Sequence, residues 1–226
     1  MILDTTDIPA SVDWVKAGAV TPIKDQAQCG SCWAFSTTGS MEGAHFLKGN
    51  ELLSFSEQQL VDCSKAEGNN GCGGGLMDNG FKYFEKTLVE LEKDYPYTAK
   101  DGTCSFAAHP KTKVEATTFA DVKPQDMDQL MAAIAKQPVS VAIEADKSMF
   151  KYYASGVLDS PSCGTHLDHG VLAVGYGVRE DGVKYYVVKN SWNTTWGDKG
   201  YIKLRAVEGA GTCCIQMQPS YPTTNV

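Results

Sequence analysis

One cysteine and one histidine, far apart in the chain, have the residue types that nucleophilic catalysis requires. Cys32 follows the short run Cys29-Gly30-Ser31, and His169 directly precedes an apolar run that is typical of a buried strand. A thiol attacks a carbonyl only as the thiolate, so a catalytic cysteine needs surroundings that lower its pKa from about 8.5. An imidazolium beside the sulfur would do this by forming an ion pair. The two residues therefore predict a nucleophilic cysteine.

The residues after Cys32 indicate a second means of stabilising a thiolate. Apolar and small side chains recur there at helical spacing, and Lys48 and Gly49 then provide an end signal. The positions on this stripe are Trp33, Thr37, Met41, Ala44 and Leu47. We therefore expect a helix that begins at Cys32. The unpaired amides and the positive end of the dipole at a helix N-terminus favour a thiolate.

Longer motifs connect these residues to a known family. The matching segments are Gln26 to Phe35, Ser56 to Cys63, Gly71 to Met77, Tyr95-Pro96-Tyr97, Asn190-Ser191-Trp192 and Trp196-Gly197. His169 lies 137 residues after Cys32, and Asn190 lies 158 residues after it. This local signature and spacing are the known pattern of papain-like enzymes. The chain resembles the papain family of cysteine peptidases, and within it the cathepsin L-like branch, from about Ile8 to Pro222.

The resemblance implies a role for each residue of the catalytic centre. Cys32 would attack the scissile carbonyl, and His169 would act first as general acid and then as general base. Asn190 would hold the imidazole through its side chain, in place of the aspartate of serine proteases. Gln26 would stabilise the oxyanion together with the backbone N–H of Cys32. The implied activity is that of an endopeptidase that requires no cofactor and no metal.

The resemblance also implies where a peptide substrate binds. The backbone of Gly74 and Gly75 would pair with the substrate as an added strand, Asp168 would border the cleft, and Trp192 would cover the Asn190–His169 hydrogen bond. The pocket for the side chain two residues before the scissile bond would be lined by Leu76, Met77, Ala142, Leu167 and Gln218. We expect this pocket to prefer apolar side chains and to accept arginine poorly, because a neutral amide does not offset the desolvation of a guanidinium.

The order of predicted elements indicates an α+β protein. Helices are expected after Cys32, from Ser56 to Cys63, after the Gly71–Gly75 loop and from Asp126 to Lys136. In the helix after the glycine loop, the expected apolar face consists of Leu76, Met77, Phe81 and Phe84. Strands are expected over Val139–Ile143, Gly170–Gly175, Lys184–Lys189 and Tyr201–Leu204. The expected arrangement is a papain-like peptidase domain at residues 8–222. It would have a mainly helical lobe (about 18–118), a mainly β, antiparallel barrel-like lobe (about 119–218), terminal segments that cross over and an active site in the cleft between the lobes.

Eight cysteines in 226 residues favour an oxidising compartment. The resemblance implies disulfides between Cys29 and Cys72, between Cys63 and Cys104, and between Cys163 and Cys213. Cys214 is the alternative partner for Cys163, although the spacing to Tyr221-Pro222 favours Cys213. The residue left over is expected to be a small buried hydrophobe without chemistry.

Charge and hydropathy exclude several classes of protein. A net charge of −7 without a basic run argues against nucleic-acid binding, and no apolar run approaches 18 residues. No signal peptide is recognisable, so we interpret the chain as a mature form in which residues 1–7 are remnant or added residues. The expected protein is a monomer of the lysosome, the vacuole or the extracellular space. Its expected partners are peptide and protein substrates, its own propeptide and cystatin-like inhibitors.

Three alternatives and one departure remain. Cys29 and Cys32 have the spacing of a redox pair, but that interpretation leaves His169 and Asn190 without a role. A zinc site is disfavoured because the other cysteines are not closely paired. A catalytically silent binding protein on the same fold is the leading alternative. The departure is Asn193-Thr194-Thr195, where the family usually has glycine at the first position, and it creates a possible glycosylation site at Asn193.

Overall fold

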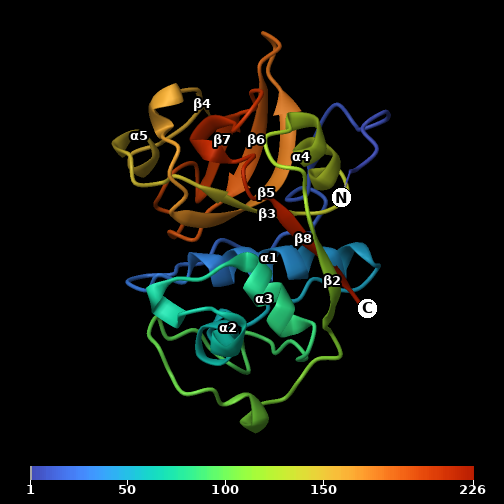
Figure 1. Ribbon diagram of the computed structural model, residues 1–226, viewed down its shortest axis with the longest axis vertical. Coiled ribbons are helices and arrows are strands. Elements are labelled where there is room, and N and C mark those ends of the chain that lie inside the picture. The colour runs from blue at the N-terminus through green and yellow to red at the C-terminus, as the bar shows by residue number, and fades with distance from the viewer. Residues whose placement is uncertain (1) are drawn as a thin grey trace.

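The computed structural model describes residues 2–226, which form a helical lobe and a sheet lobe (Figure 1). The helices are α1 (Cys32–Leu47), α2 (Glu57–Cys63), α3 (Met77–Phe84), α4 (Met127–Ile134) and α5 (Ser148–Lys151). The strands are β1 (Val12–Asp13), β2 (Ala116–Asp121), β3 (Val139–Ile143), β4 (Val157–Leu158), β5 (His169–Val178), β6 (Lys184–Lys189), β7 (Tyr201–Arg205) and β8 (Ser220–Thr224). Helices α1 to α3 belong to the lower lobe in Figure 1, and most strands belong to the upper lobe.

The sheet has the strand order β2-β8-β3-β5-β6-β7-β4, and β1 pairs with β5 outside this path. All pairs are antiparallel except β4 with β7. In the β3–β5 pair, Ile143 lies opposite His169 and Ala142 lies opposite Gly170. The register therefore places Ala142 beside the start of β5, where His169 lies.

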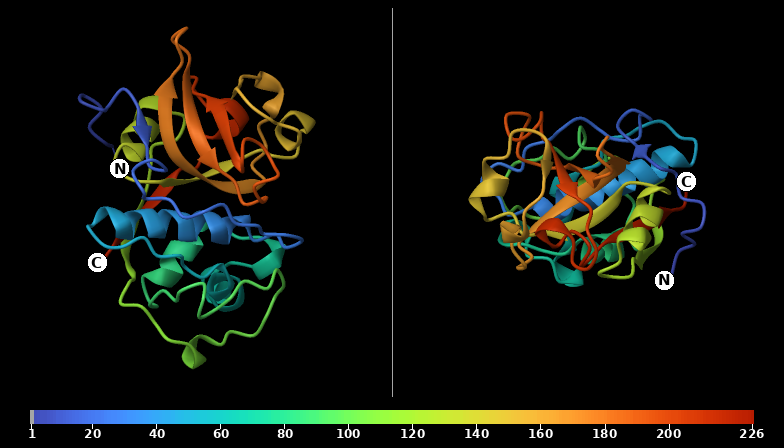
Figure 2. Two further views of the ribbon diagram at one scale, coloured as in Figure 1. Left: turned by 180° about the vertical axis from the view of Figure 1, so that it is seen from behind. Right: turned by 90° about the horizontal axis from the view of Figure 1, so that it is seen from above.

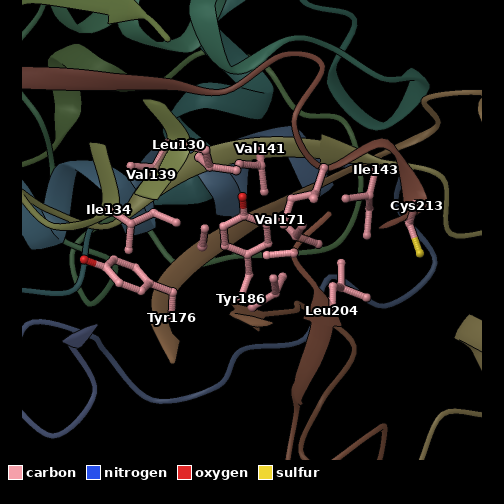
Figure 3. Packing of buried hydrophobic residues seen from close by; sticks show 14 of the residues in the cluster. Leu130, Ile134, Val139, Val141, Ile143, Val171, Tyr176, Tyr186, Leu204 and Cys213 are labelled. Carbon is pink, nitrogen blue, oxygen red and sulfur yellow. The ribbon is translucent and has the colours of Figure 1, made fainter. Parts of the chain in front are cut away.

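Each lobe has its own apolar core, and α1 lies between the two. The sheet lobe packs Ile134, Val141, Tyr186 and Leu204 among other buried residues (Figure 3). The helical lobe buries another cluster, which includes Trp33, Met41, Phe55, Phe81 and Phe84. Two separately packed cores joined along one helix leave room for a cleft where the lobes meet.

Helix α1 begins at Cys32, as the spacing predicts, but its burial differs from the expected single stripe. Every residue from Trp33 to His45 is buried, because the sheet lobe covers the second side of the helix. A Cβ atom at Gly39 would meet the Leu172 side chain at 2.7 Å, and one at Gly43 would meet Pro138 at 2.6 Å. Glycine at these positions therefore allows the helix to approach the sheet lobe closely. Leu47, at the exposed end of the stripe, is only partly covered.

The other predicted helices also form, and two of them, α2 and α4, begin with a side-chain cap. The Ser56 hydroxyl accepts a hydrogen bond from the Gln59 N–H, and the Asp126 carboxylate accepts one from the Gln129 N–H. The prediction of the apolar face of α3 is wrong at Leu76. Leu76 precedes the helix as its N-cap, and its side chain is 55% exposed, because the helix begins one residue later.

Strands β2 and β8 were not predicted. Only one residue of β2, Ala116, is buried, so the strand lacks an apolar alternation. Strand β8 contains Pro222, and a proline argues against a strand in a sequence pattern. The two strands pair along their length, and β8 also contacts β3. Both chain ends lie on the same side of the molecule (Figure 2). Near the N-terminus, Leu3 is buried and its backbone exchanges two hydrogen bonds with the Gln129 side chain.

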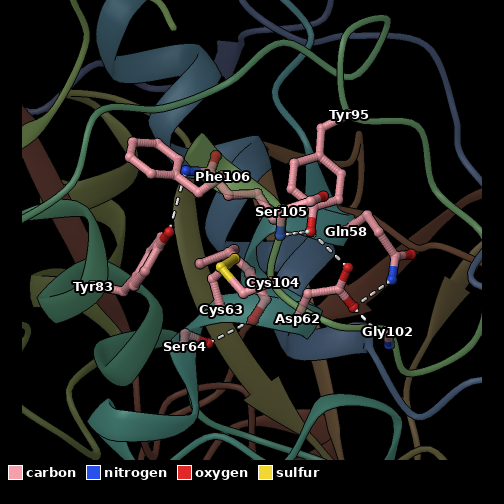
Figure 4. Close-up of a disulfide and its surroundings, with 12 residues drawn as sticks. Gln58, Asp62, Cys63, Ser64, Tyr83, Tyr95, Gly102, Cys104, Ser105 and Phe106 are labelled. Atoms are coloured by element: carbon pink, nitrogen blue, oxygen red, sulfur yellow. Dashed lines mark hydrogen bonds between the residues drawn. A yellow bond between two sulfur atoms is a disulfide. The ribbon is translucent and has the colours of Figure 1, made fainter. Parts of the chain in front are cut away.

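Three disulfides join Cys29 to Cys72, Cys63 to Cys104, and Cys163 to Cys213. The second is surrounded by hydrogen bonds to Asp62, which accepts from Gln58, Tyr95 and the Gly102 N–H (Figure 4). These contacts tie the loop after Tyr95 to α2.

The remaining free cysteines are Cys32 and the buried Cys214. Pairing of Cys29 with Cys72 is incompatible with the redox interpretation of Cys29 and Cys32.

Candidate active site

A cleft of about 880 Å³ is lined by residues of both lobes. Its lining residues are Gln26, Gly30, Cys32, Cys72, Gly73, Gly74, Gly75, Leu76, Met77, Asp78, Asp121, Ala142, Leu167, Asp168, His169, Gly170, Trp192, Met217 and Gln218. The structure thus brings the sequence-predicted catalytic and substrate-binding residues to one place, with Asn190 behind His169.

Cys32 is the first residue of α1, and its thiol is free. Burial alone would raise the pKa of this thiol. The hydrogen bond and the charge of His169, together with the N–H groups of Gly170 and Trp33, outweigh that effect and lower the pKa. The Gly170 N–H lies 3.4 Å from the sulfur. The surroundings of Cys32 therefore favour a thiolate.

His169 is the first residue of β5, and its side chain is buried. Burial alone would lower the pKa of the imidazole, but the hydrogen bond and charge of Cys32 and the hydrogen bond to Asn190 raise it. Nε2 lies 2.7 Å from Oδ1 of Asn190, and this oxygen also accepts from the Ser191 N–H at 2.8 Å. An acceptor at this position makes Nε2 the protonated nitrogen, and Nδ1 is then available to the sulfur.

Aromatic rings cover the histidine. The Trp192 ring centroid lies 4.8 Å from that of His169, and Trp196 and Phe150 pack edge-on against Trp192 at 5.4 and 5.5 Å. The Trp196 N–H donates to the carbonyls of Phe150 and Lys151. The aromatic group limits the access of water to the His169–Asn190 hydrogen bond, which strengthens that bond.

Gln26 is buried beside Cys32 with its amide held in one orientation. Its Oε1 accepts from the Ser191 hydroxyl at 2.7 Å, and its Nε2 lies 3.1 Å from the Cys29 carbonyl. The Tyr97 hydroxyl donates to the Gln26 carbonyl and also contacts the Ser31 hydroxyl, each at 2.6 Å. Sequence reasoning missed the support from Ser191 and Tyr97, although both lie within the quoted motifs.

The glycine wall of the cleft has a geometry that larger residues would not tolerate. Gly74 has a φ of +116°, and a Cβ atom at Gly75 would meet Trp33 at 2.7 Å. Trp33 itself is anchored by a hydrogen bond to the Gly71 carbonyl at 3.1 Å. The N–H and C=O of Gly75 have no hydrogen-bond partner within residues 2–226. An extended peptide could therefore pair with them.

The expected pocket residues differ in exposure. Met77 is buried, Ala142 and Leu167 are partly buried, and Leu76 and Gln218 are exposed. Met217, Asp78 and Asp121 also line the cleft, and sequence reasoning missed all three. Burial raises the pKa of Asp78, and Asp121 raises it further, while Ser220 acts in the opposite direction. No local sequence pattern marks these three residues as part of the cleft, because they meet there only when segments distant in the chain pack together.

Asn193 directly follows Trp192, which lines the cleft, and it adopts a left-handed conformation with a φ of +67°. Asparagine tolerates this region better than most residues do. Its Oδ1 accepts from the Thr194 N–H at 2.6 Å, and its exposed side chain lies 3.4 Å from Asp25.

Within residues 2–226, no group of three or more His, Cys, Asp or Glu side chains is placed to hold a metal ion. No helix in the same range is both long and apolar enough to cross a membrane.

Comparison with known proteins identifies the family. Residues 8–223 match the papain family cysteine proteases, and the chain belongs to this family. It is 51% identical over 221 residues to a cathepsin L-like peptidase of Aedes aegypti, which covers 96% of this chain and 64% of that protein. The chain spans about three fifths of the length of the curated relatives it matches.

Solved structures agree with the assignment. The Carica candamarcensis cysteine protease CMS1MS2, in complex with E-64, has a TM-score of 0.88 and 37% identity, covering 96% of this chain and 99% of that chain. The proform of Amb a 11, a ragweed pollen cysteine protease, has a TM-score of 0.91 and 42% identity, covering 96% of this chain and 67% of that one. The α+β papain fold with one helical and one sheet-rich lobe is therefore confirmed.

Proposed function

We propose that this protein is a cysteine endopeptidase in which Cys32 is the nucleophile and His169 the general acid and base. One observation carries the proposal: the free thiol at the start of α1 lines the same cleft as a buried histidine, which lowers the pKa of the thiol and which Asn190 orients. The relatives and solved neighbours named above are cysteine proteases, which supports the same reaction class.

The first half of the reaction forms an acyl-enzyme. The Cys32 thiolate attacks the scissile carbonyl carbon, so a carbon–sulfur bond forms and the carbonyl electrons move to oxygen. The Gln26 Nε2 and the Cys32 N–H, which has no partner within α1, would donate to that oxyanion. When the tetrahedral intermediate collapses, the carbon–nitrogen bond breaks and the His169 imidazolium gives its proton to the leaving amine.

The second half restores the enzyme. Neutral His169 removes a proton from water as the water attacks the thioester, and the carbon–sulfur bond then breaks. The products are a carboxylic acid and the thiolate–imidazolium pair. Asn190 keeps the imidazole plane in position through both halves, because its Oδ1 holds Nε2 at 2.7 Å.

We further propose that the substrate lies along Gly74 and Gly75, with Asp168 bordering the cleft. The side chain two residues before the scissile bond would enter the pocket of Leu76, Met77, Ala142, Leu167 and Gln218. The apolar character of most of these residues favours leucine, phenylalanine or valine there. The proform and E-64 structures of relatives support a propeptide and small-molecule inhibitors as partners, and cystatin-like inhibitors are a further proposal. A lysosomal, vacuolar or secreted location is consistent with the disulfides.

Active-site titration tests the proposal against a catalytically silent binding protein. A thiol-directed epoxide should label one cysteine per chain in the parent and in Cys214→Ala, and none in Cys32→Ala. Cys32→Ala should also lose hydrolysis of blocked fluorogenic dipeptides. Full activity of Cys32→Ala, or labelling that depends on Cys214, would overturn the proposal.

A further inference from the structure

A second, much smaller cavity lies behind the catalytic residues, at the junction of the lobes. Its volume is about 20 Å³, enough for one water molecule. Its polar lining includes Lys24, Thr38 and Glu57 from the helical lobe, and Lys189 and Asn190 from the end of β6 and the residue after it. The cavity therefore connects the residue that orients His169 with a group of buried charges.

The buried charges form a connected ion-pair cluster. The Lys24 amine lies 2.6 Å from Glu57, 3.2 Å from Glu42 and 2.8 Å from Glu92. The Lys189 amine donates to Thr21 at 3.0 Å, and Thr21 donates to Glu42 at 2.6 Å. Glu42 and Glu57 are fully buried, so their geometry is fixed by these partners.

Three hydrogen-bonding groups of the residues that line this cavity have unused capacity. Oε2 of Glu57 and Nδ2 of Asn190 are buried and have no hydrogen-bond partner within residues 2–226. The Lys189 amine has three hydrogens and donates one of them, to Thr21. Two donors and one carboxylate acceptor match a single water, which can accept two hydrogen bonds and donate two. Leaving such buried groups unpaired is unfavourable, because they lose the hydrogen bonds that water gives them in the unfolded chain.

We propose that Lys189 and Glu57 are positioning residues that act on Asn190 through one water molecule in this cavity. The water accepts from Lys189 and from Asn190 Nδ2, and it donates to Glu57 Oε2. Holding Nδ2 on this side keeps Oδ1 facing His169, because a flipped amide would set a donor against the Nε2–H. The Ser191 N–H donates to the same oxygen at 2.8 Å. The water and the Ser191 N–H would therefore both orient the Asn190 amide.

This inference rests on the proposed peptidase function, and a double-mutant cycle tests the coupling. Lys189→Met removes the donor while keeping the length of the side chain. We expect it to lower kcat about fivefold with KM unchanged, and to have no further effect in an Asn190→Ala background. Glu57→Gln should behave in the same way if Lys189→Met folds poorly. Epoxide titration of Cys32 counts the active sites in every variant.

Two matched controls separate positioning from general destabilisation. Lys184→Met changes an exposed lysine of the same strand β6, and Glu92→Gln changes the same ionic cluster outside the cavity. Both should leave kcat unchanged. The proposal would be overturned if Lys189→Met lowered kcat equally in the parent and Asn190→Ala backgrounds, or if it lowered kcat in neither.

A measurement without catalysis completes the test. A high-resolution crystal structure of the Cys32→Ala protein should contain one water within hydrogen-bonding distance of Glu57 Oε2, Lys189 Nζ and Asn190 Nδ2. A dry cavity would overturn the inference whether or not the parent is active. An inactive parent with the water in place would refute the peptidase function and leave the structural link standing.

Discussion

At the scale of single residues, the fold places a thiol and an imidazole where each changes the pKa of the other. The pKa of Cys32 is lowered and that of His169 is raised, against the effect of burial in both cases. The reactive ion pair exists above the first pKa and below the second. Activity should therefore rise with pH through the Cys32 pKa and fall through the His169 pKa.

The pH profile of kcat/KM on a blocked dipeptide should accordingly be bell-shaped. Asn190→Ala should move the alkaline limb to lower pH and reduce activity, because the Asn190 hydrogen bond contributes to the raised pKa of His169. Asn193→Ala, which changes the residue after Trp192, is the control and should keep the parent profile. A rate that continues to rise through about pH 10, or an unmoved limb in Asn190→Ala, would contradict the ion pair.

Gln218 offers a test of specificity at the same scale. Its neutral side chain is exposed at the pocket, so arginine two residues before the scissile bond should be cleaved more slowly than leucine. Gln218→Glu should raise the arginine-to-leucine ratio of kcat/KM by about fivefold, as expected for an ion pair worth about 1 kcal/mol. Gln218→Met has similar length and should leave arginine disfavoured. A parent that cleaves both substrates equally would show that other groups of the cleft decide the preference.

The sequon at Asn193 gives the third prediction. Its side chain is exposed next to Trp192, where the leaving-group half of a substrate would lie. In a glycosylating host, a glycan there should slow the cleavage of proteins and leave dipeptide turnover unchanged. Asn193→Gly and Thr195→Ala should both restore the ratio of protein to dipeptide turnover, and intact mass reports occupancy. The hypothesis would be contradicted if Asn193 carried no glycan, or if a glycosylated parent had the same ratio of protein to dipeptide turnover as the two variants.

At the scale of elements, caps determine where the predicted helices begin. The Asp126 side chain accepts the Gln129 N–H at 3.1 Å at the start of α4. Asp126→Ala should therefore reduce the free energy of unfolding by about 1 kcal/mol in denaturant titrations. Asp128→Ala, exposed two residues later, should change it by less than about 0.5 kcal/mol. Similar losses in both variants would mean that charge at the helix start, and not the cap, is responsible.

At the scale of the whole molecule, the ionic cluster between the lobes links stability to pH. Burial, offset in part by Lys24, raises the pKa of Glu57 to about 7, with Glu92 and Glu42 acting in the same direction as burial. Ionisation of Glu57 is therefore less favourable in the folded protein than in the unfolded chain. The stability that protonated Glu57 contributes is complete below the unfolded pKa of about 4.5 and is lost as pH rises towards 7.

This linkage predicts opposite pH slopes for two carboxylates of the cluster. A Cys32→Ala background avoids self-digestion. In it, the free energy of unfolding of Glu57→Gln should rise relative to that of the parent by on the order of 1–3 kcal/mol between pH 4.5 and 7. Burial alone would raise the pKa of Glu92, but Lys24 and Ser54 lower it, so its stabilisation is lost as pH falls. The free energy of unfolding of Glu92→Gln should accordingly fall relative to that of the parent as pH rises through about 4.5 from the acid side, with little further change up to pH 7. If the free energies of unfolding of both variants changed with pH in the same direction relative to the parent, the opposite pKa shifts of Glu57 and Glu92 would be contradicted.

Local patterns in the sequence determined the elements that present the chemistry. The spacing after Cys32 predicts α1, and β-branched and aromatic runs predict the bounds of β3 and β6, because 3.6-residue and two-residue periods are properties of short segments. The motifs around Cys32, His169 and Asn190 indicated the family.

Only the tertiary structure decided what these elements contact. It buries α1 on both sides, pairs β2 with the proline-containing β8, and brings Met217 and Asp78 into the cleft. It also places the Lys24 cluster and its cavity behind Asn190. These arrangements depend on contacts between segments that are far apart in the chain. No window of neighbouring residues encodes them, since each arises from the packing of two lobes against each other.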